Sequence, residues 1–211
     1  MSKKDNLWKL AETWKNMRHP PRPSQKNQEV YEKYIKEVSK RENPKMLVLG
    51  STPSIRDLAN KHGVDITVID NNPRAYKALK MLKEREGDEN FVKQDWEEMD
   101  IEKKFDLIMG DTALNMLKWE QYSNVIENIR EHLKSDGLYV ERMPSRIRQN
   151  ISENEFASWL KRLQDEFGSK FVQATSYPIL LFSTENGREE MKFSDCGKNV
   201  KPLYEKGKIS K

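Results

Sequence analysis

Short blocks of apolar residues alternate with longer polar or amphipathic segments through the middle of the chain. The blocks MLVLG, ITVID and FDLIMG have the length of buried strands and are bounded by turn-forming residues. The intervening segments 53–62, 73–85 and 119–133 are predicted helices. This alternation of strands and helices predicts an α/β fold, in which a mostly parallel sheet is covered by helices on both faces.

Further strand patterns extend this sheet. NFVKQD and GLYVERM are predicted strands, and the later blocks KFVQATSYP and ILLFSTE complete the predicted sheet. The chain has 211 residues, enough for one α/β domain with elaborations. We therefore expect one Rossmann-like, doubly wound domain over residues 45–185.

The N-terminal segment has a helical pattern of its own. A first helix is predicted over residues 5–18, and the prolines of RHPPRPS end it. Its apolar face consists of Leu7, Leu10, Ala11, Trp14 and Met17. Ser24 is placed to cap a second helix. We expect residues 1–44 to form a helical arm or lid, and residues 186–211 to form a basic C-terminal extension.

Charge is distributed unevenly along the chain, although the net charge is only +4. Residues 1–45 hold 12 Lys and Arg against 6 Asp and Glu, residues 46–185 hold 19 against 24, and residues 186–211 hold 7 against 4. Basic ends suit an anionic substrate or RNA, but lysine-rich termini are also commonly just solvated. Both interpretations stay open.

Cysteine and histidine are scarce. Cys196 is the single cysteine and forms no internal disulfide, and no apolar run approaches the ~20 residues of a membrane span. We expect a cytoplasmic protein that does not enter a membrane. His19, His62 and His132 lack the spacing of a metal site, so no metal is predicted.

Two predicted turns from strand to helix share one design. The strand KMLVL runs into GSTP and the strand ITVI runs into DNNP, so Thr52 and Asn72 are predicted helix caps with proline at the next position. A helix start offers unpaired N–H groups, and Gly50 lets a ligand approach the backbone. Asp70 follows this glycine by about twenty residues, the spacing at which a carboxylate binds both hydroxyls of a ribose. Together these features indicate an adenosine-containing ligand.

Two more carboxylates end the next strands. Asp95 precedes Trp96, which places a hydrogen-bond acceptor for an exocyclic amino group beside an aromatic face for a purine. Alternatively, Asp95 is a loop cap and Trp96 is a core or rim aromatic. Asp111 follows the strand FDLIMG and is considered below.

In order and spacing, five segments resemble the successive motifs of class I S-adenosylmethionine-dependent methyltransferases. They are LVLGSTP, VIDNNP, KQDWEEM, FDLIMGDTALNML and LKSDGLYVERM, within residues 45–143. The resemblance implies a methyltransferase with S-adenosylmethionine as cofactor. It implies cofactor contacts at Gly50, Ser51, Thr52, Asp70, Asn71, Asp95, Trp96 and Asp111. The opening loop departs from the family pattern, because Val48 replaces the usual acidic residue and Thr52 and Ser54 replace later glycines.

Three residues are candidates for roles around the methyl acceptor. Asp111 is the best-placed candidate base, with Asn115 as an orienting partner; alternatively, Asp111 only positions the cofactor. Arg22 follows the stiff PPRPS prolines and suits a carboxylate, either of the cofactor or of an acidic acceptor. The alternative is an arm that covers a sheet edge while Arg22 remains solvated.

The choice of ligand and acceptor rests on what the motifs lack. A dinucleotide site needs G-x-G-x-x-G, and this chain has Gly50, Thr52 and Ile55 at those places. No N-P-P-Y cluster follows the fourth strand, which argues against amino methylation of a nucleic-acid base. We expect a small-molecule acceptor first, an RNA acceptor second, and a cofactor-binding regulator without catalysis third.

Overall fold

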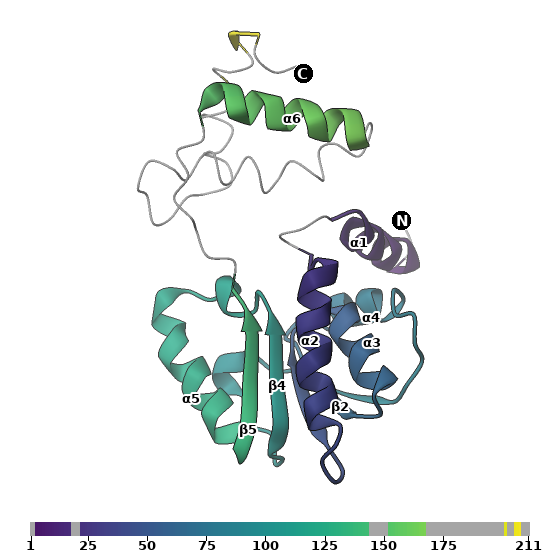
Figure 1. Ribbon diagram of the computed structural model, residues 1–211, viewed down its shortest axis with the longest axis vertical. Coiled ribbons are helices and arrows are strands. Elements are labelled where there is room, and N and C mark those ends of the chain that lie inside the picture. The colour runs from purple at the N-terminus through teal and green to yellow at the C-terminus, as the bar shows by residue number, and fades with distance from the viewer. Residues whose placement is uncertain (1–2, 18–21, 144–151, 168–200, 202–204, 208–211) are drawn as a thin grey trace. The chain divides into compact units, whose positions relative to one another are not determined.

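The computed structural model describes residues 3–17, 22–143, 152–167, 201 and 205–207. Within them lies a five-stranded sheet in the order β3-β2-β1-β4-β5, with every pair parallel (Figure 1). The strands are β1 (Lys45–Leu49), β2 (Asp65–Ile69), β3 (Glu89–Val92), β4 (Phe105–Asp111) and β5 (Leu133–Arg142). The predicted Rossmann-like α/β fold is confirmed.

The strand order changes direction at β1, because β2 and β3 lie on one side of it and β4 and β5 lie on the other. Met46 of β1 lies opposite Ile66 of β2 on one side and Leu107 of β4 on the other. The chain reaches β2 and β3 through α3 (Pro53–Lys61) and α4 (Pro73–Lys80), and it reaches β5 through α5 (Tyr122–His132). The carboxyl ends of β1 and β4 therefore lead away in opposite directions, and ligands bind at such a switch point in open α/β sheets.

Alternate residues of the buried strands pack against opposite faces. On one face, Met46 and Val48 pack in a cluster with residues of α2 (Gln25–Val38), α3 and α4. On the other face, Leu47 and Leu49 pack with Val125 and Ile129 of α5. Both faces of β1 are apolar because parallel strands in α/β folds are covered on both sides.

The second N-terminal helix is part of this core. Tyr31, Ile35 and Val38 of α2 are buried in the cluster formed with β1 and β4. The ribbon of α2 runs along the sheet (Figure 1). The predicted cap is confirmed, because Ser24 Oγ accepts from the Asn27 amide at 3.3 Å and the Asn27 side chain accepts from the Ser24 amide at 2.9 Å. Although we assigned α2 to an arm, it covers the sheet.

Contacts divide the chain into two compact units. One contains residues 1–15 and 22–144, and the other contains residues 16–21 and 145–211. The first includes most of α1 (Lys3–Asn16), and the second includes α6 (Glu153–Phe167). The predicted strands KFVQATSYP and ILLFSTE and most of the C-terminal extension lie outside the described residues. The predicted boundaries after residues 44 and 185 stay predictions.

Among the described residues, no helix has both the length and the apolar composition that a membrane span requires.

A buried ion pair joins α3 to β3. Arg56 and the Glu89 side chain are fully buried, and the guanidinium donates to both carboxylate oxygens, with 2.9 Å between Nε and Oε2. Lys83 Nζ lies 3.2 Å from the same carboxylate, and Tyr76 OH donates to it at 3.1 Å. Burial raises the pKa of Glu89, but Arg56 and Lys83 outweigh that effect and hold it below the usual value of 4.5.

This ion pair predicts a pH-dependent stability. Glu89→Gln should lower the free energy of unfolding at pH 7 by roughly 3 kcal/mol, because it leaves Arg56 without its buried counter-charge. A carboxylate whose pKa is depressed by folding stabilises the protein above its unfolded pKa and loses that effect as pH falls through the folded pKa. The difference between wild type and variant should therefore shrink as pH falls below 4.5.

Urea unfolding at pH 7 and pH 3 measures this difference. Glu86→Gln, at an exposed position, is the matched control and should change little at either pH. A difference between wild type and Glu89→Gln that stays constant across this range would contradict the assignment.

Candidate functional site

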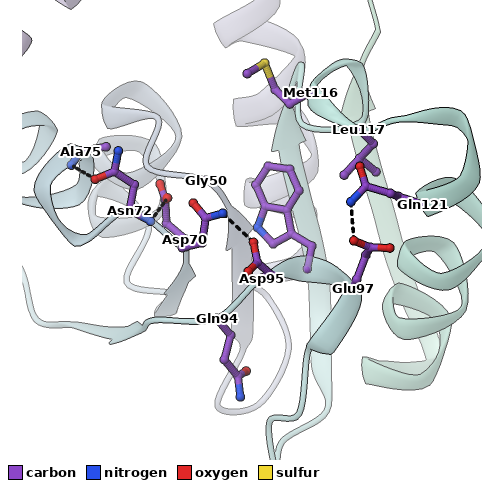
Figure 2. Close-up of a pocket in the computed structure, with 12 residues that line it drawn as sticks. Gly50, Asp70, Asn72, Ala75, Gln94, Asp95, Glu97, Met116, Leu117 and Gln121 are labelled. Carbon is purple, nitrogen blue, oxygen red and sulfur yellow. Dashed lines mark hydrogen bonds between the residues drawn. The ribbon is translucent and has the colours of Figure 1, made fainter.

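A cavity of about 430 Å³ lies at the carboxyl ends of β1, β2 and β3 (Figure 2). Its volume is within the range of about 300–1,000 Å³ found for small-molecule sites. It is lined by Gly50, Asp70, Asn71, Asn72, Ala75, Gln94, Asp95, Trp96, Glu97, Met116, Leu117 and Gln121. Five of the residues that we predicted to contact the cofactor thus meet in one cavity.

Gly50 forms a tight turn at the end of β1. Its φ of +82° is in the region that side chains disfavour, and its amide donates to the Ile69 carbonyl at 2.9 Å. A Cβ at this position would lie 3.7 Å from Cζ2 of Trp96, so the indole ring packs beside the glycine. The turn and the indole together form one wall of the cavity.

Ser51 and Thr52 are buried behind this turn and do not line the cavity. Thr52 occupies the predicted N-cap position of α3, but its side chain makes no capping hydrogen bond. Pro53 has no N–H to satisfy, and its fixed φ starts the helix without a side-chain cap. At the second turn the predicted cap is confirmed, because Asn72 Oδ1 accepts from the amides of Arg74 and Ala75, each at 3.1 Å.

Asp70 is held at the end of β2 by neutral donors. Ser51 Oγ donates to its Oδ2 at 2.5 Å. The Asn72 amide donates to its Oδ1 at 2.8 Å (Figure 2). No ion pair involves this carboxylate among the described residues. Asp70 is thus fixed in place without a counter-charge in the described part of the chain.

Asp95 and Trp96 lie across the cavity from Asp70. Asn71 Nδ2 donates to Asp95 Oδ1 at 2.5 Å, and the indole N–H of Trp96 donates to the Ile69 carbonyl at 3.2 Å. The Asp95 side chain makes no capping hydrogen bond to the short helix η1 (Trp96–Glu98) that follows. The simple capping role considered for Asp95 is therefore excluded, and the indole is a half-buried wall of the cavity.

Part of the lining was not predicted from the sequence. Gln94 and Glu97 flank Asp95, whereas Met116, Leu117 and Gln121 come from the connection between β4 and α5. Gln121 donates a hydrogen bond to Glu97, which ties this connection to η1 (Figure 2). The available signal in the sequence was the apolar pair Met116-Leu117 directly after the polar Asn115. This signal did not identify the lining, because buried and exposed apolar residues look alike in sequence.

The electrostatic character of the cavity is acidic. Asp70, Asp95 and Glu97 line it, and no Lys or Arg does so among the described residues. In the same described ranges, no group of three or more His, Cys, Asp or Glu side chains is arranged to hold a metal ion. Such a lining suits a ligand with hydroxyl and amino groups and a positive charge, whereas a pyrophosphate would meet three like charges.

Asp111 and Asn115 lie outside this lining. Asp111 is buried at the end of β4, where its Oδ1 accepts from Tyr31 OH at 2.7 Å and from Arg142 Nε. Asn115 is exposed in the short helix η2 (Leu114–Met116). Their roles as base and orienting partner, and the contact of Asp111 with the cofactor, stay predictions.

Arg22 also lies away from the cavity lined by Gly50 and Asp70. Its Nη1 donates to the Lys15 carbonyl at 3.1 Å, and it lines a second cavity with Trp14 and residues of α3. The structure therefore does not bring Arg22 together with the predicted cofactor residues. Its predicted contact with a carboxylate, and the predicted lid, stay predictions.

Glu141 is a half-buried acid that the sequence did not reveal. It lies opposite Gly110 at the ends of β5 and β4, and a Cβ at Gly110 would overlap its Oε2. Burial, together with the charge of Asp111, raises the pKa of Glu141 to about 7, and the hydrogen bond from Tyr139 OH offsets only part of this effect.

One protein-family model matches this part of the chain. Residues 47–137 match the model described as a methyltransferase domain, which spans the strands from β1 into β5. A search among curated proteins found no match.

Solved structures of methyltransferases share the fold. The CcbJ methyltransferase from Streptomyces caelestis is 14% identical with a TM-score of 0.55, and the match covers 68% of this chain and 59% of that one. The glycopeptide N-methyltransferase MtfA, complexed with S-adenosylmethionine, is 16% identical with a TM-score of 0.50, and the match covers 57% of this chain and 56% of that one. The chain thus spans somewhat more than half the length of either structure. Residues 47–137 are thus similar to a methyltransferase domain, and the sheet has the fold of these solved methyltransferases.

Proposed function

We propose that the chain binds S-adenosylmethionine in the cavity at the carboxyl ends of β1 to β3 and transfers its methyl group to a small-molecule acceptor. One observation carries this proposal. Asp70, Asp95 and Trp96 line the same cavity, beside the turn at Gly50. These groups match a ribose, an adenine amino group and a purine face, as the family resemblance implies for these positions.

The charge of the lining supports this cofactor over a dinucleotide. S-adenosylmethionine carries a sulfonium cation and an adenosine, which suit three carboxylates without a basic partner in the lining. A pyrophosphate needs a glycine-rich turn at which two backbone segments approach it closely. Here the turn has one glycine, and the next residues, Ser51 and Thr52, are buried behind it.

In methyl transfer, the main task of the protein is to align the acceptor with the methyl group of the cofactor. The bound cofactor supplies an activated methyl group, so positioning of the acceptor contributes most of the catalysis. Asp70 and Asp95 would hold the nucleoside, and Trp96 would exclude water from one side of it. An acceptor that must lose a proton would find two acids at the ends of β4 and β5.

These two acids differ in what they offer. Asp111 Oδ1 already accepts two hydrogen bonds, whereas its Oδ2 is buried and has no hydrogen-bond partner among the described residues. Glu141 has a pKa of about 7, which suits a general base near neutral pH. We propose Asp111 and Glu141 as the candidate proton acceptors, with Asn115 as the orienting residue for Asp111.

A small acceptor is favoured by the surroundings of the cavity. Met116 and Trp119 are strongly exposed at the connection after β4, with 77% and 82% of their surfaces accessible. Exposed apolar and aromatic groups beside a cavity suit an organic molecule. Nucleic-acid acceptors are held mainly by Lys and Arg at their phosphates, and no such residue lines the cavity in the described part of the chain.

Turnover distinguishes the candidate functions. The purified protein with S-adenosylmethionine should form S-adenosylhomocysteine when given the small-molecule fraction of a cell extract, and not when given total RNA from the same cells. Mass spectrometry of the fraction would identify the methylated product. Turnover on RNA alone would contradict the proposed acceptor class, and cofactor binding without any turnover would indicate a regulator.

Replacement of Asp70 tests the cofactor assignment. Asp70→Ala should weaken the binding of S-adenosylhomocysteine by ~1.5–3 kcal/mol, or roughly 10- to 100-fold, because a charged hydrogen-bond acceptor is lost. Asp65→Ala, at the exposed start of the same strand, is the control and should bind like wild type. Calorimetry that gives equal affinities for the two variants would reject the ribose contact.

Gly50 provides a second test with a matched control. Gly50→Ala and Gly63→Ala both place a side chain at positive φ, +82° and +67°, so each should cost about 1–2 kcal/mol of stability. Only the Cβ at Gly50 would approach Trp96 in the cavity wall, whereas no atom lies within 4 Å of a Cβ at Gly63. Affinity for S-adenosylhomocysteine should fall about tenfold in Gly50→Ala alone. An equal loss of affinity in both variants would show that general destabilisation is the cause.

A further inference from the structure

The buried ion pair behind the sheet is connected to the cavity. Arg56 Nη1 donates to the Ser51 carbonyl at 3.1 Å, in addition to its two hydrogen bonds with Glu89. The hydroxyl of the same serine donates to Asp70 Oδ2 at 2.5 Å. Glu89, Arg56, Ser51 and Asp70 thus form a continuous chain of hydrogen bonds from β3 to the cavity.

We infer that Arg56 is a positioning residue, which fixes Ser51 so that the Ser51 hydroxyl orients Asp70 toward the ribose of the cofactor. This inference rests on the proposed function. Arg56 is fully buried and does not line the cavity, so its effect on the ligand passes through Ser51.

The turn at Gly50 needs such a support. It has one glycine, followed by Ser51 and Thr52, and the Thr52 side chain forms no capping hydrogen bond. A buried backbone carbonyl needs a hydrogen-bond donor, and the Arg56 guanidinium supplies one to Ser51. In this turn a side chain from the following helix fixes the backbone.

The geometry requires arginine. Nε and Nη2 are directed to Glu89 while Nη1 is directed to Ser51, which a planar guanidinium achieves and a single ammonium group does not. The guanidinium also lies 4.8 Å from the ring centroid of Tyr76, a distance that allows a cation–π contact. Lysine at this position would keep the positive charge but lose the fixed direction toward Ser51.

The surroundings of Glu89 offer a matched control. Lys83 Nζ also pairs with this carboxylate, and its side chain is only 5% exposed. In the described part of the chain, Lys83 makes no hydrogen bond to Ser51. Loss of Lys83 therefore weakens the same buried cluster without breaking the chain to Asp70. If the cluster had a purely structural role, replacement of Arg56 and replacement of Lys83 would change ligand recognition in the same way.

Recognition of the ribose is the readout. Calorimetry would compare S-adenosylhomocysteine with an analogue that lacks the 2′ and 3′ hydroxyls, at a temperature well below the measured midpoint of each variant. Wild type should prefer the hydroxylated ligand at least tenfold. Arg56→Lys and Ser51→Ala should each reduce this preference to threefold or less, and Lys83→Met should keep the wild-type value.

Failure of the inference and failure of the proposed function give different results. A wild-type protein that binds neither ligand would overturn the proposed function. A wild type with the expected preference, together with an Arg56→Lys variant that retains it, would overturn the role of Arg56. If Arg56→Lys does not fold, the triple variant Arg56→Gln/Lys83→Met/Glu89→Gln replaces it, because removing Arg56, Lys83 and Glu89 together leaves none of these three buried charges unpaired. Retention of the preference in that variant would equally overturn the inference.

Discussion

The parallel pairing of β1 with both β2 and β4 is the constraint on which the site depends. It brings the carboxyl ends of the strands to one edge of the sheet, and the chain leaves β1 and β4 in opposite directions there. Gly50, Asp70 and Asp95 each follow the end of a strand or lie in the turn after it, so their meeting is a consequence of strand order. Apolar residues on both faces of β1 stabilise this arrangement, because helices cover the sheet on either side.

The predicted residues that meet in one cavity are those governed by this simple rule. A glycine after the first strand, an acid at the end of the second and an acid with an aromatic after the third can be located from strand patterns alone. For Asp111, the alternation of residues along the strand could have refined the prediction by showing which face of the sheet it lies on. Leu107 and Met109 of β4 pack on the face covered by α2, and strand alternation places Asp111 on the same face, where it accepts from Tyr31.

Other features depend on contacts that no local pattern contains. Arg56 is a charged residue on a short helix, and its burial follows from Glu89 on a strand 33 residues later. Gln121 lines the cavity because it donates to Glu97, 24 residues earlier. The missing cap at Thr52 has a related cause, because the same loop obtains its support from the Arg56 side chain. Sequence alone reveals the positions of these residues but not their partners.

The buried carboxylates of this domain are paired with arginine, whereas the carboxylates at the cavity are not. Arg56 and Arg142 are paired with the buried acids Glu89 and Asp111, so these cations contribute little field at the cavity. The carboxylates at the cavity are treated differently, because Asp70 is held by a hydroxyl and a backbone amide, and Asp95 by an amide side chain. Neutral donors orient a carboxylate without cancelling its charge. Asp70, Asp95 and Glu97 therefore lie at the carboxyl edge of the sheet without a Lys or Arg in the described lining. A ligand that brings a sulfonium cation and a ribose gains from this arrangement, whereas a phosphate-bearing ligand would be repelled by it.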